Sequence, residues 1–544
     1  KFVDHTHADA ILNVTNRPEG FKLCNKIFND KVALVPYVMP GFMLAKKVYE
    51  IYAKNPKINC LILMNHGIFT FADDAKEAYS LMIKYVSQAE RIIKKLKVKK
   101  IKQIKKFSTS FEPYEIAPII RGLLSDNQPD EKFIVNYRTN SHLKYFINGK
   151  NVKTYSTKGT ATPDHVIRVK PFPLIITPKK KSTLNDFKAI AQKAMTNYRK
   201  KYISYFNKNK KKGKDKKVML DTSPRVVFVQ NVGVFTVGRN LSGAKIAGDL
   251  TETNAKVIAS VEETSKYKFI PEKDLFDVEY WSLEQAKIKK KKKILEGNVV
   301  VISGATGTIG FATYKMFKNH GAEVVLLDNN LQRLNELKNK ISDLCIHCDV
   351  TNKKSIKNAF KQVCEKYGGI DILISNAGTA PGGAIGEVSD DDLRKSFEIN
   401  FFAHQNCASE AVKIMKQQNI DGCLLFNISK QAVNPGKNFG PYGLPKSALL
   451  SLCKQYAVDY GSYGIRSNGV NADRIRSGLM TDKMIKTRAK ARSVSEDNYM
   501  RGNLLLNEVK AEDVAKAFFH LATSKKTTGA VLTVDGGNIA ASLR

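Results

Sequence analysis

The sequence predicts an α/β protein in which two α/β regions follow one another, the second built on a doubly wound parallel sheet. From Asn298 onward, short apolar runs alternate with helical patterns, which is typical of a parallel sheet covered by helices. The first of these runs leads into a glycine-rich turn at Gly304–Gly310. Residues 1–286 mix strand and helix patterns, and a basic linker, 287–297, joins them to the second region, 298–544.

Length and composition limit the class of protein. A chain of 544 residues with 43% hydrophobic content exceeds one ordinary core and is typical of a folded multidomain protein. No apolar run reaches about 18 residues, so we expect no membrane span. No signal peptide is visible, and because the chain starts at Lys1 inside a strand pattern, we expect further residues before it.

The eight cysteines have no regular spacing, so we expect no disulfide framework. Cys345 and Cys348 form a CxxC pair without a partner pair or a thioredoxin-like context, and we expect both to be buried structural residues. A reducing cytoplasm is the expected location.

The formal net charge of +38 raises the question of nucleic-acid binding. Residues 294–544 carry about +8 and the preceding residues about +30, much of it in the lysine runs Lys208–Lys217 and Lys287–Lys293. No aromatic stripe accompanies these lysines, so solvated surface and linker are favoured over a polyanion-binding site.

Secondary structure in the first region is predicted from periodicity. We expect a helix over Asp73–Lys97, another near Asn185–Tyr202 and a third over Ala244–Val261. Strand patterns cover Lys1–Val3, Phe133–Tyr137, Val166–Val169, Leu174–Ile176, Arg225–Val229 and Val234–Val237.

One internal similarity indicates a duplication. Asn65–Phe71 matches Asn231–Val237, each after an apolar run and before a long helical pattern. A weaker match pairs Ala8–Leu12 with Pro163–Ile167. Residues 110–286 are then a degenerate second half, and chance similarity is the alternative. In that alignment Val232, Thr160 and Thr162 replace His66, His5 and His7.

The glycine turn of the second region predicts a dinucleotide site of the Rossmann type. It lies between a strand and a helix, so its backbone N–H groups and the helix N-terminus can face a pyrophosphate. The strand that follows ends in Asp328, which can accept hydrogen bonds from ribose hydroxyls and repel a 2′-phosphate, favouring NAD over NADP. The turn consists of Gly304, Ala305, Thr306, Gly307, Thr308, Ile309 and Gly310.

Further motifs follow the later strands. Asp349 and Val350 end the third strand, where an aspartate can bind the adenine amino group, and Asn376, Ala377 and Gly378 end the fourth. Together with Asn400, Ser429, Tyr442 and Lys446, this constellation resembles the short-chain dehydrogenase/reductase family over about 250 residues.

The proposed chemistry depends on Tyr442 and Lys446, which lie at positions i and i+4 of a helix. A nearby ammonium is expected to lower the pKa of the tyrosine, allowing it to take the substrate proton while hydride leaves for NAD. The resemblance implies that Ser429 binds the substrate oxygen and that Asn400 holds a water. The segment 471–478 lacks the Pro-Gly pair that is common in the family, and Thr308 stands where glycine is frequent.

The first region contains a candidate metal site. His5 and His7 face the same side of a strand, and His66 ends another apolar run, so three imidazoles can leave positions open as in a catalytic zinc site. The pattern around these histidines resembles the class II aldolase/adducin family, which implies that His5, His7 and His66 bind Zn²⁺. The family's acid/base glutamate would precede Lys1, and adducin-like members without activity are the alternative.

The order of the parts, together with Ser429–Gly440 and Asp535–Asn538, resembles fused rhamnulose-1-phosphate aldolase/short-chain dehydrogenase proteins. That resemblance implies cleavage of a deoxyketose 1-phosphate and oxidation of lactaldehyde with NAD. A sugar or polyol dehydrogenase with a non-catalytic N-terminal region is the second hypothesis, and a polyanion-binding protein is the third. The expected partners are small sugar-phosphate, aldehyde or alcohol substrates and further copies of the chain, without a membrane or nucleic acid.

Overall fold

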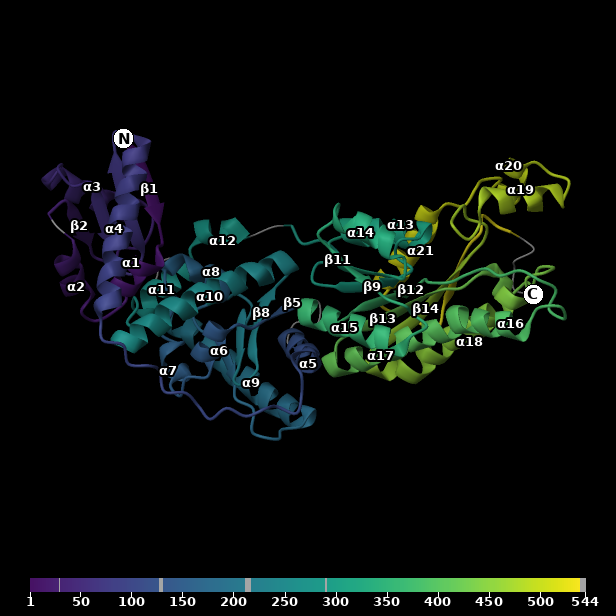
Figure 1. The fold of residues 1–544 in the computed structure, drawn as a ribbon, viewed down its shortest axis with the longest axis horizontal. Helices are drawn as coiled ribbons and strands as arrows, with labels where there is room; N and C mark the ends of the chain where they lie inside the picture. The colour runs from purple at the N-terminus through teal and green to yellow at the C-terminus, as the bar shows by residue number, and fades with distance from the viewer. Residues whose placement is uncertain (29, 127–130, 211–216, 289–290, 539–544) are drawn as a thin grey trace. The chain divides into compact units, whose positions relative to one another are not determined.

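The computed structural model describes residues 1–28, 30–126, 131–210, 217–288 and 291–538 (Figure 1). Most of the lysine run Lys208–Lys217 and part of the run Lys287–Lys293 lie outside these residues. The chain forms two compact units. Unit 1 consists of Lys1–Pro113, Asn136–Gly238 and Ser242–Lys291, and unit 2 of Tyr114–Val135, Arg239–Leu241 and the chain from Lys292 onward. This differs from the expected division at 286, because Tyr114–Val135 belongs with the C-terminal unit.

The first half of unit 1 is a four-stranded sheet in the order β1-β4-β3-β2. β1 and β4 are antiparallel, as are β3 and β4, whereas β2 and β3 are parallel. Every residue of β3 is buried, which explains its continuous apolar run. The elements are β1 (Phe2–Thr6), α1 (Asp9–Thr15), α2 (Gly20–Ile27), β2 (Val32–Val35), α3 (Phe42–Lys54), β3 (Cys60–Leu63), β4 (Gly67–Ala72) and α4 (Ala75–Lys95).

The second half of unit 1 repeats this topology, with strand order β5-β8-β7-β6. Local details repeat as well. Asn65 and Asn231 both have positive φ, 61° and 66°, at the turn before the equivalent strands. The Thr70 hydroxyl donates to the Ala78 carbonyl at 2.9 Å, and the Thr236 hydroxyl donates to the Ala244 carbonyl at 2.8 Å. The similarity between the two sequences therefore corresponds to a shared fold.

The elements of this half are β5 (Ile134–Arg138), α6 (Ser141–Ile147), α7 (Val152–Tyr155), η1 (Pro163–His165), α8 (Val166–Val169), β6 (Leu174–Ile176), α9 (Leu184–Lys210), β7 (Val226–Val229), β8 (Gly233–Gly238), α10 (Leu241–Thr264), α11 (Glu272–Glu279) and α12 (Ser282–Ile288). The predicted strand at Val166–Val169 is wrong. Pro163 begins a 3₁₀ turn there, and Val166 and Val169 are buried on one face of the short helix that follows.

The predicted alignment of Thr160 and Thr162 with His5 and His7 is also wrong. A Cβ on Gly67 would lie 2.5 Å from the Thr6 carbonyl, and one on Gly233 would lie 3.0 Å from the Arg138 carbonyl. Arg138 therefore corresponds to Thr6, and Tyr137 on β5 corresponds to His5. The second half still has no imidazole at the positions of His5 and His66, since Tyr137 and Val232 stand there.

Unit 2 contains a seven-stranded, fully parallel sheet in the order β11-β10-β9-β12-β13-β14-β15. Figure 1 shows α13, α14 and α21 on one face of this sheet and α15, α17 and α18 on the other. The strand order reverses between β9 and β12, which is where ligands bind in doubly wound sheets. This confirms the predicted fold class.

Its strands are β9 (Val299–Ser303), β10 (Glu323–Asp328), β11 (Leu344–His347), β12 (Ile372–Ser375), β13 (Gly422–Asn427), β14 (Ile465–Ala472) and β15 (Val531–Val534). Its helices are α5 (Pro113–Ser125), α13 (Thr308–Asn319), α14 (Leu331–Lys338), α15 (Lys353–Tyr367), α16 (Asp390–Phe397), η2 (Glu398–Phe402), α17 (Ala403–Gln418), η3 (Lys430–Ala432), α18 (Gly440–Tyr460), η4 (Gly461–Tyr463), α19 (Asp482–Lys490), α20 (Glu496–Met500) and α21 (Ala511–Thr523).

Helix α5 is held in unit 2 by a buried ion pair. The Arg121 guanidinium contacts both carboxylate oxygens of Asp371, at 3.1 and 2.6 Å, and neither side chain is exposed to solvent. Arg121 also donates to the carbonyls of Phe133 and Gly297. Asp371 precedes β12 and accepts from the Val299 amide at 2.7 Å, so the pair connects α5 to the first residues of two central strands.

All eight cysteines are free and buried, in line with the absence of a disulfide framework. Among the described residues, no helix combines the length and apolar content needed to cross a membrane.

We predict that Asp371→Asn lowers the free energy of unfolding of unit 2 by about 3 kcal/mol, because the substitution leaves Arg121 buried without its counter-charge. Burial alone would raise the pKa of Asp371, but Arg121 and Lys132 hold it below its usual range. The stabilisation is therefore present above the ordinary carboxyl pKa and is lost as the pH falls through the lowered value.

The measurement is calorimetric unfolding of the full chain, comparing the transitions of the variant with those of the wild type. Asp391→Asn, which removes an exposed carboxylate from the first turn of α16, is the control. Equal effects of the two substitutions would contradict a stabilising role for the buried pair.

Candidate active sites

The glycine turn of unit 2 lies at the carboxyl end of β9. Gly304 has φ +61°, and a Cβ there would lie 2.9 Å from the Ala377 Cα, so only glycine fits this turn without strain. A Cβ on Gly310 would lie 2.3 Å from the Gly304 carbonyl oxygen, which explains why the helix can begin so close to the strand. Gly307 is the N-cap of α13, and the first-turn N–H groups of that helix remain available to a phosphate.

Asp328 lies beside this turn at the end of β10. One carboxylate oxygen accepts from the Thr306 amide at 2.9 Å and from the Thr306 hydroxyl at 2.8 Å, and the other accepts from the Asn330 amide. Asp328 is buried and faces a turn in which Gly304 and Gly310 have no room for a side chain, so the residues fit a dinucleotide with a free ribose diol.

A hydrogen-bond chain connects the turn to the predicted catalytic helix. The side-chain amide of Asn376 donates to the carbonyls of Ser303 and Gly304 at 3.2 and 3.1 Å. Asn427 donates to the Asn376 side chain at 2.8 Å, and the Lys446 ammonium donates to the Asn427 carbonyl at 2.9 Å. The position of Lys446 is therefore tied to the carboxyl ends of the strands that form the cofactor crevice.

Tyr442, Ser429 and Lys446 meet in one place, as their spacing predicts. Ser429 forms a hydrogen bond to Tyr442 that partly offsets the effect of burial, which raises the pKa of the phenol. Burial also lowers the pKa of Lys446 to about 7. The expected lowering of the tyrosine pKa is absent, because both groups are desolvated and the Lys446 amino group lies 5.9 Å from the ring centroid.

Asn400 lies in η2, a π-helical turn between α16 and α17, and is fully buried. Its side-chain oxygen accepts from the Thr379 amide at 3.2 Å, and its amide donates to Ser396 at 3.1 Å. π-Helical turns often occur at functional sites because the extra residue redirects a side chain.

The remaining predicted cofactor residues lie along the same edge. Asp349 follows β11 and accepts from the amide and the hydroxyl of Thr351, while Val350 is buried. A Cβ on Gly378 would lie 2.9 Å from the Asn400 side-chain oxygen, so the turn that follows β12 passes close to the predicted catalytic residue Asn400.

The substrate pocket of unit 2 has a free volume of about 210 Å³ and includes Ser429 and Tyr442 in its lining. The positive charge of this pocket was not predicted from the sequence. Arg488 stacks on Phe439 at 4.1 Å, and Arg492 lies over Tyr499 at 5.1 Å. Neither arginine forms an ion pair with another described residue. The remaining charged lining residues are Lys430, Lys437, Asp473 and Arg474.

The three histidines of unit 1 also meet. Their ligand nitrogens all lie within 4.8 Å of one another. The His5 Nδ1 lies 2.9 Å from the Ile68 carbonyl, which can only accept a hydrogen bond, so Nε2 carries the lone pair that a metal needs. That Nε2 lies 3.1 Å from the His7 Nε2. A Cβ on Gly67 would crowd both rings, which explains the glycine after His66.

The protonation states of these histidines also suit a metal. Burial lowers the pKa of His7 to about 4 although Asp164 raises it, and burial with a contribution from His5 lowers that of His66 to about 4. Both imidazoles are therefore neutral at physiological pH, the form that binds metal. Sequence reasoning did not assign Asp164 to this site, and its carboxylate lies 3.4 Å from the His7 Nε2 and 3.9 Å from the His66 Nε2.

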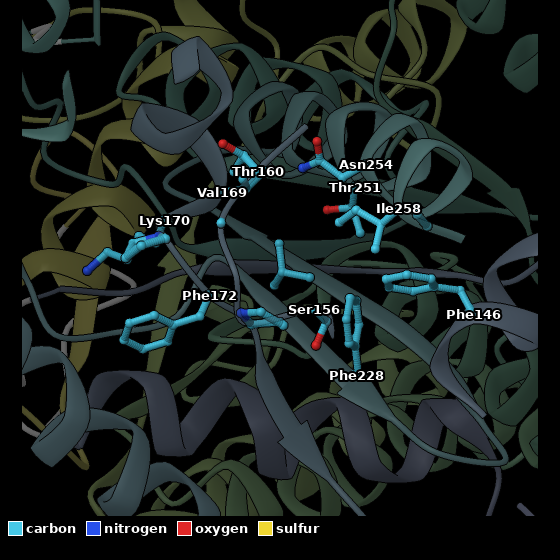
Figure 2. A pocket seen from close by; sticks show the side chains of 15 residues that line it. Phe146, Ser156, Thr160, Val169, Lys170, Phe172, Phe228, Thr251, Asn254 and Ile258 are labelled. Carbon is cyan, nitrogen blue, oxygen red and sulfur yellow. The ribbon is translucent and has the colours of Figure 1, made fainter. Parts of the chain in front are cut away.

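The second half of unit 1 contains a small, mostly apolar pocket (Figure 2). Its free volume is about 40 Å³, enough for one or two waters and too small for a sugar phosphate. Figure 2 shows the Lys170 amino group pointing away from the cavity. This pocket does not replace the histidine site as a substrate site.

Three family models match successive parts of the chain. Residues 1–93 match the class II aldolase and adducin N-terminal domain, and residues 112–288 match the second domain of class II aldolases. Residues 304–538 match an enoyl-(acyl carrier protein) reductase family model.

Similar proteins cover the same parts. A protein of Bacillus subtilis (strain 168) named "Uncharacterized oxidoreductase YuxG" is 29% identical over the whole chain and 82% of its own length. Short chain aldehyde dehydrogenase 1 of Euphorbia lathyris is 33% identical over 45% of this chain and 89% of its own length. (+)-Borneol dehydrogenase 1 of Salvia officinalis is 32% identical over 45% of this chain and 95% of its own length.

The fold and these relatives define an oxidoreductase fused to class II aldolase domains. Through its C-terminal part, the chain belongs to the short-chain dehydrogenase/reductase family.

We predict that Tyr442→Phe reduces the turnover of any alcohol or aldehyde substrate about 100-fold or more, because the proton acceptor is lost. Affinity for the reduced dinucleotide, measured by its intrinsic fluorescence, should change little. Tyr463→Phe, at an exposed phenol, serves as the control. A Tyr442→Phe variant with unchanged turnover would show that another group moves the proton.

Proposed function

We propose that the chain is a bifunctional enzyme. The histidine site of unit 1 binds Zn²⁺ and cleaves a deoxyketose 1-phosphate of the rhamnulose-1-phosphate type. Unit 2 then oxidises the resulting lactaldehyde with NAD. The observation that carries this proposal is the convergence of three histidine nitrogens in a chain that also contains the predicted dehydrogenase residues. A relative named as an aldehyde dehydrogenase is in line with an aldehyde substrate.

When bound, the zinc would polarise the substrate carbonyl and stabilise the enediolate formed on cleavage. The residues of this chain supply the ligand geometry. His5 is oriented by the Ile68 carbonyl and stacks on Phe69 at 4.0 Å, and His66 is held at the start of β4. Three ligands leave a coordination position for substrate.

In unit 2, aldehyde oxidation would proceed from the hydrated aldehyde. Tyr442 would take a proton from one hydroxyl of this gem-diol, and bound NAD would supply the hydride acceptor that brings the carbon to the carboxylic acid level. Ser429 would hold the reacting oxygen, and Lys446 would bind the nicotinamide ribose.

We predict that His66→Ala removes bound zinc and aldol cleavage but leaves NAD-dependent oxidation of added lactaldehyde within about twofold of the wild type. Zinc content by mass spectrometry and separate assays of the two half-reactions measure this. His142→Ala, at an exposed histidine of α6, is the control. Cleavage that persists without zinc would exclude the proposed aldolase chemistry.

We predict that NAD is preferred over NADP, because the Asp328 carboxylate would face the 2′-phosphate. Asp328→Ser should shift the ratio of kcat/KM for NAD over NADP by about 10-fold or more, since it removes one like-charge contact. The test is steady-state kinetics with both cofactors. An unchanged ratio would mean that other residues select the cofactor.

A second candidate function is favoured by the arginines of the substrate pocket. Only 17 of the 89 basic residues are arginine, so Arg474, Arg488 and Arg492 at one pocket stand out from the lysine-rich background. Arg474 is paired with Asp473, but the guanidinium groups of Arg488 and Arg492 form no ion pair with another described residue, and such groups suit a carboxylate or phosphate. Unit 2 would then be an alcohol dehydrogenase for an anionic sugar or polyol, beside an aldolase-like region that only binds.

For this candidate, the double variant Arg488→Ala/Arg492→Ala should raise KM for phosphorylated or carboxylated polyols about 10-fold, because a charged hydrogen bond is lost. KM for neutral lactaldehyde should stay the same. Arg333→Ala on α14 is the control. Equal losses for neutral and anionic substrates would contradict anion selection.

A further inference from the structure

We propose that Asp164 binds the metal of the histidine site as a fourth ligand, supplied by the degenerate second half of unit 1. This inference rests on the proposed zinc site, and it assigns a function to a half that has no such site of its own. The carboxylate of Asp164 is the acidic group that the structure places within ion-pair distance of two of the three histidines.

Two of the known separations fit a tetrahedral centre. Zinc–nitrogen and zinc–oxygen bonds of about 2.0–2.1 Å place tetrahedral ligand atoms about 3.3–3.4 Å from one another. The His5 and His7 Nε2 atoms are 3.1 Å apart, and the His7 Nε2 lies 3.4 Å from the Asp164 Oδ2. The His66 Nε2 lies 3.9 Å from the same oxygen, so this separation would shorten on binding. The tight group of ligand atoms consists of the three histidines, and Asp164 lies at its edge.

The segment that carries Asp164 is fixed on both sides. The Thr162 hydroxyl donates to the His66 carbonyl at 3.2 Å, which joins this segment to the turn that holds a predicted ligand. The His165 Nδ1 lies 2.8 Å from the Asn254 side-chain oxygen, and that oxygen also accepts from the Ala161 amide at 2.9 Å. Asn254 on α10 therefore orients the turn that presents Asp164 to the histidines.

Charge favours the same assignment. Three neutral imidazoles leave a bound zinc with its full double charge, and a carboxylate ligand reduces it. Among the described residues, no lysine or arginine forms an ion pair with Asp164, and its carboxylate contacts His7 and His66. Its side chain is about one-third exposed, so substrate could displace it from the metal. Asp164 would thus occupy the open position in the resting enzyme.

The duplication explains how this ligand arises. In the second half, Tyr137 and Val232 stand where His5 and His66 stand in the first. That half has no imidazole at these positions, while its η1 turn lies against the site of the first half. A site formed by both halves would require the second half for metal binding even though it has no complete set of its own.

The experiment uses the full chain, loaded with Co²⁺ or Zn²⁺ alone. Asp164→Asn keeps the shape of the side chain and removes its charge, so folding should be preserved. We expect zinc affinity, measured by competition with a chromogenic chelator, to fall about 10-fold or more. We also expect the visible absorption of the Co²⁺ protein to shift as an oxygen ligand is exchanged. Asp9→Asn in the first turn of α1 is the matched control.

The outcomes separate the two proposals. If the wild type binds metal and Asp164→Asn leaves both affinity and spectrum unchanged, the role of Asp164 is overturned while the zinc site stands. If the wild type and His66→Ala bind zinc equally weakly, the zinc site itself is overturned, and the role of Asp164 with it. An equal loss in Asp164→Asn and Asp9→Asn would show a general charge effect and would also overturn the assignment.

Discussion

The buried ion pair between Arg121 and Asp371 is the interaction on which the order of unit 2 depends. Asp371 accepts from the Val299 amide and stands before β12, while Arg121 donates to the Gly297 carbonyl just before β9. The amino ends of β9 and β12 are therefore held together. Gly304 and Asn376 follow the carboxyl ends of the same two strands. The ion pair at the amino ends of β9 and β12 therefore also constrains the distance between their carboxyl ends, where the cofactor crevice lies.

This constraint also explains why the division of the chain does not follow sequence order. The second-domain family model of the aldolases begins at residue 112, yet Tyr114–Val135 belongs to the compact unit of the dehydrogenase. A Cβ on Gly122 would lie 1.8 Å from the Gln418 carbonyl oxygen, so α5 approaches the end of α17 too closely for any other residue. Cutting the chain near residue 290 would remove this helix and uncover a buried carboxylate.

The parts predicted well from sequence are those in which a local pattern and the fold agree. The glycine turn, Asp328, Asn376 and the pair Tyr442 and Lys446 lie on consecutive βα units, and periodicity places each at the same sheet edge. His5, His7 and His66 are similar, since His5 lies in β1, His7 follows that strand and His66 lies between β3 and β4. Asp164 could not be assigned in this way, because its approach to the histidines depends on the packing of one half against the other.

Short apolar segments were the weakest predictions for the same reason. Val166–Val169 suits a strand by composition, but Pro163 starts a helical turn whose buried face these valines cover. The positive charge of the dehydrogenase pocket could not be predicted from local patterns either. Arg488 and Arg492 lie on α19 and just after it, and only the return of this segment over Phe439 and Tyr499 places them at the substrate.

The ionisation of Tyr442 and Lys446 depends on what surrounds them in the crevice. Burial favours the neutral form of each group and therefore disfavours a phenolate paired with an ammonium. The hydrogen bond from Lys446 to the Asn427 carbonyl nevertheless fixes the amine beside the cofactor crevice. An oxidised nicotinamide ring is cationic, and a positive charge near a phenol favours its ionised form. A bound oxidised dinucleotide would thus help Tyr442 to act as a base.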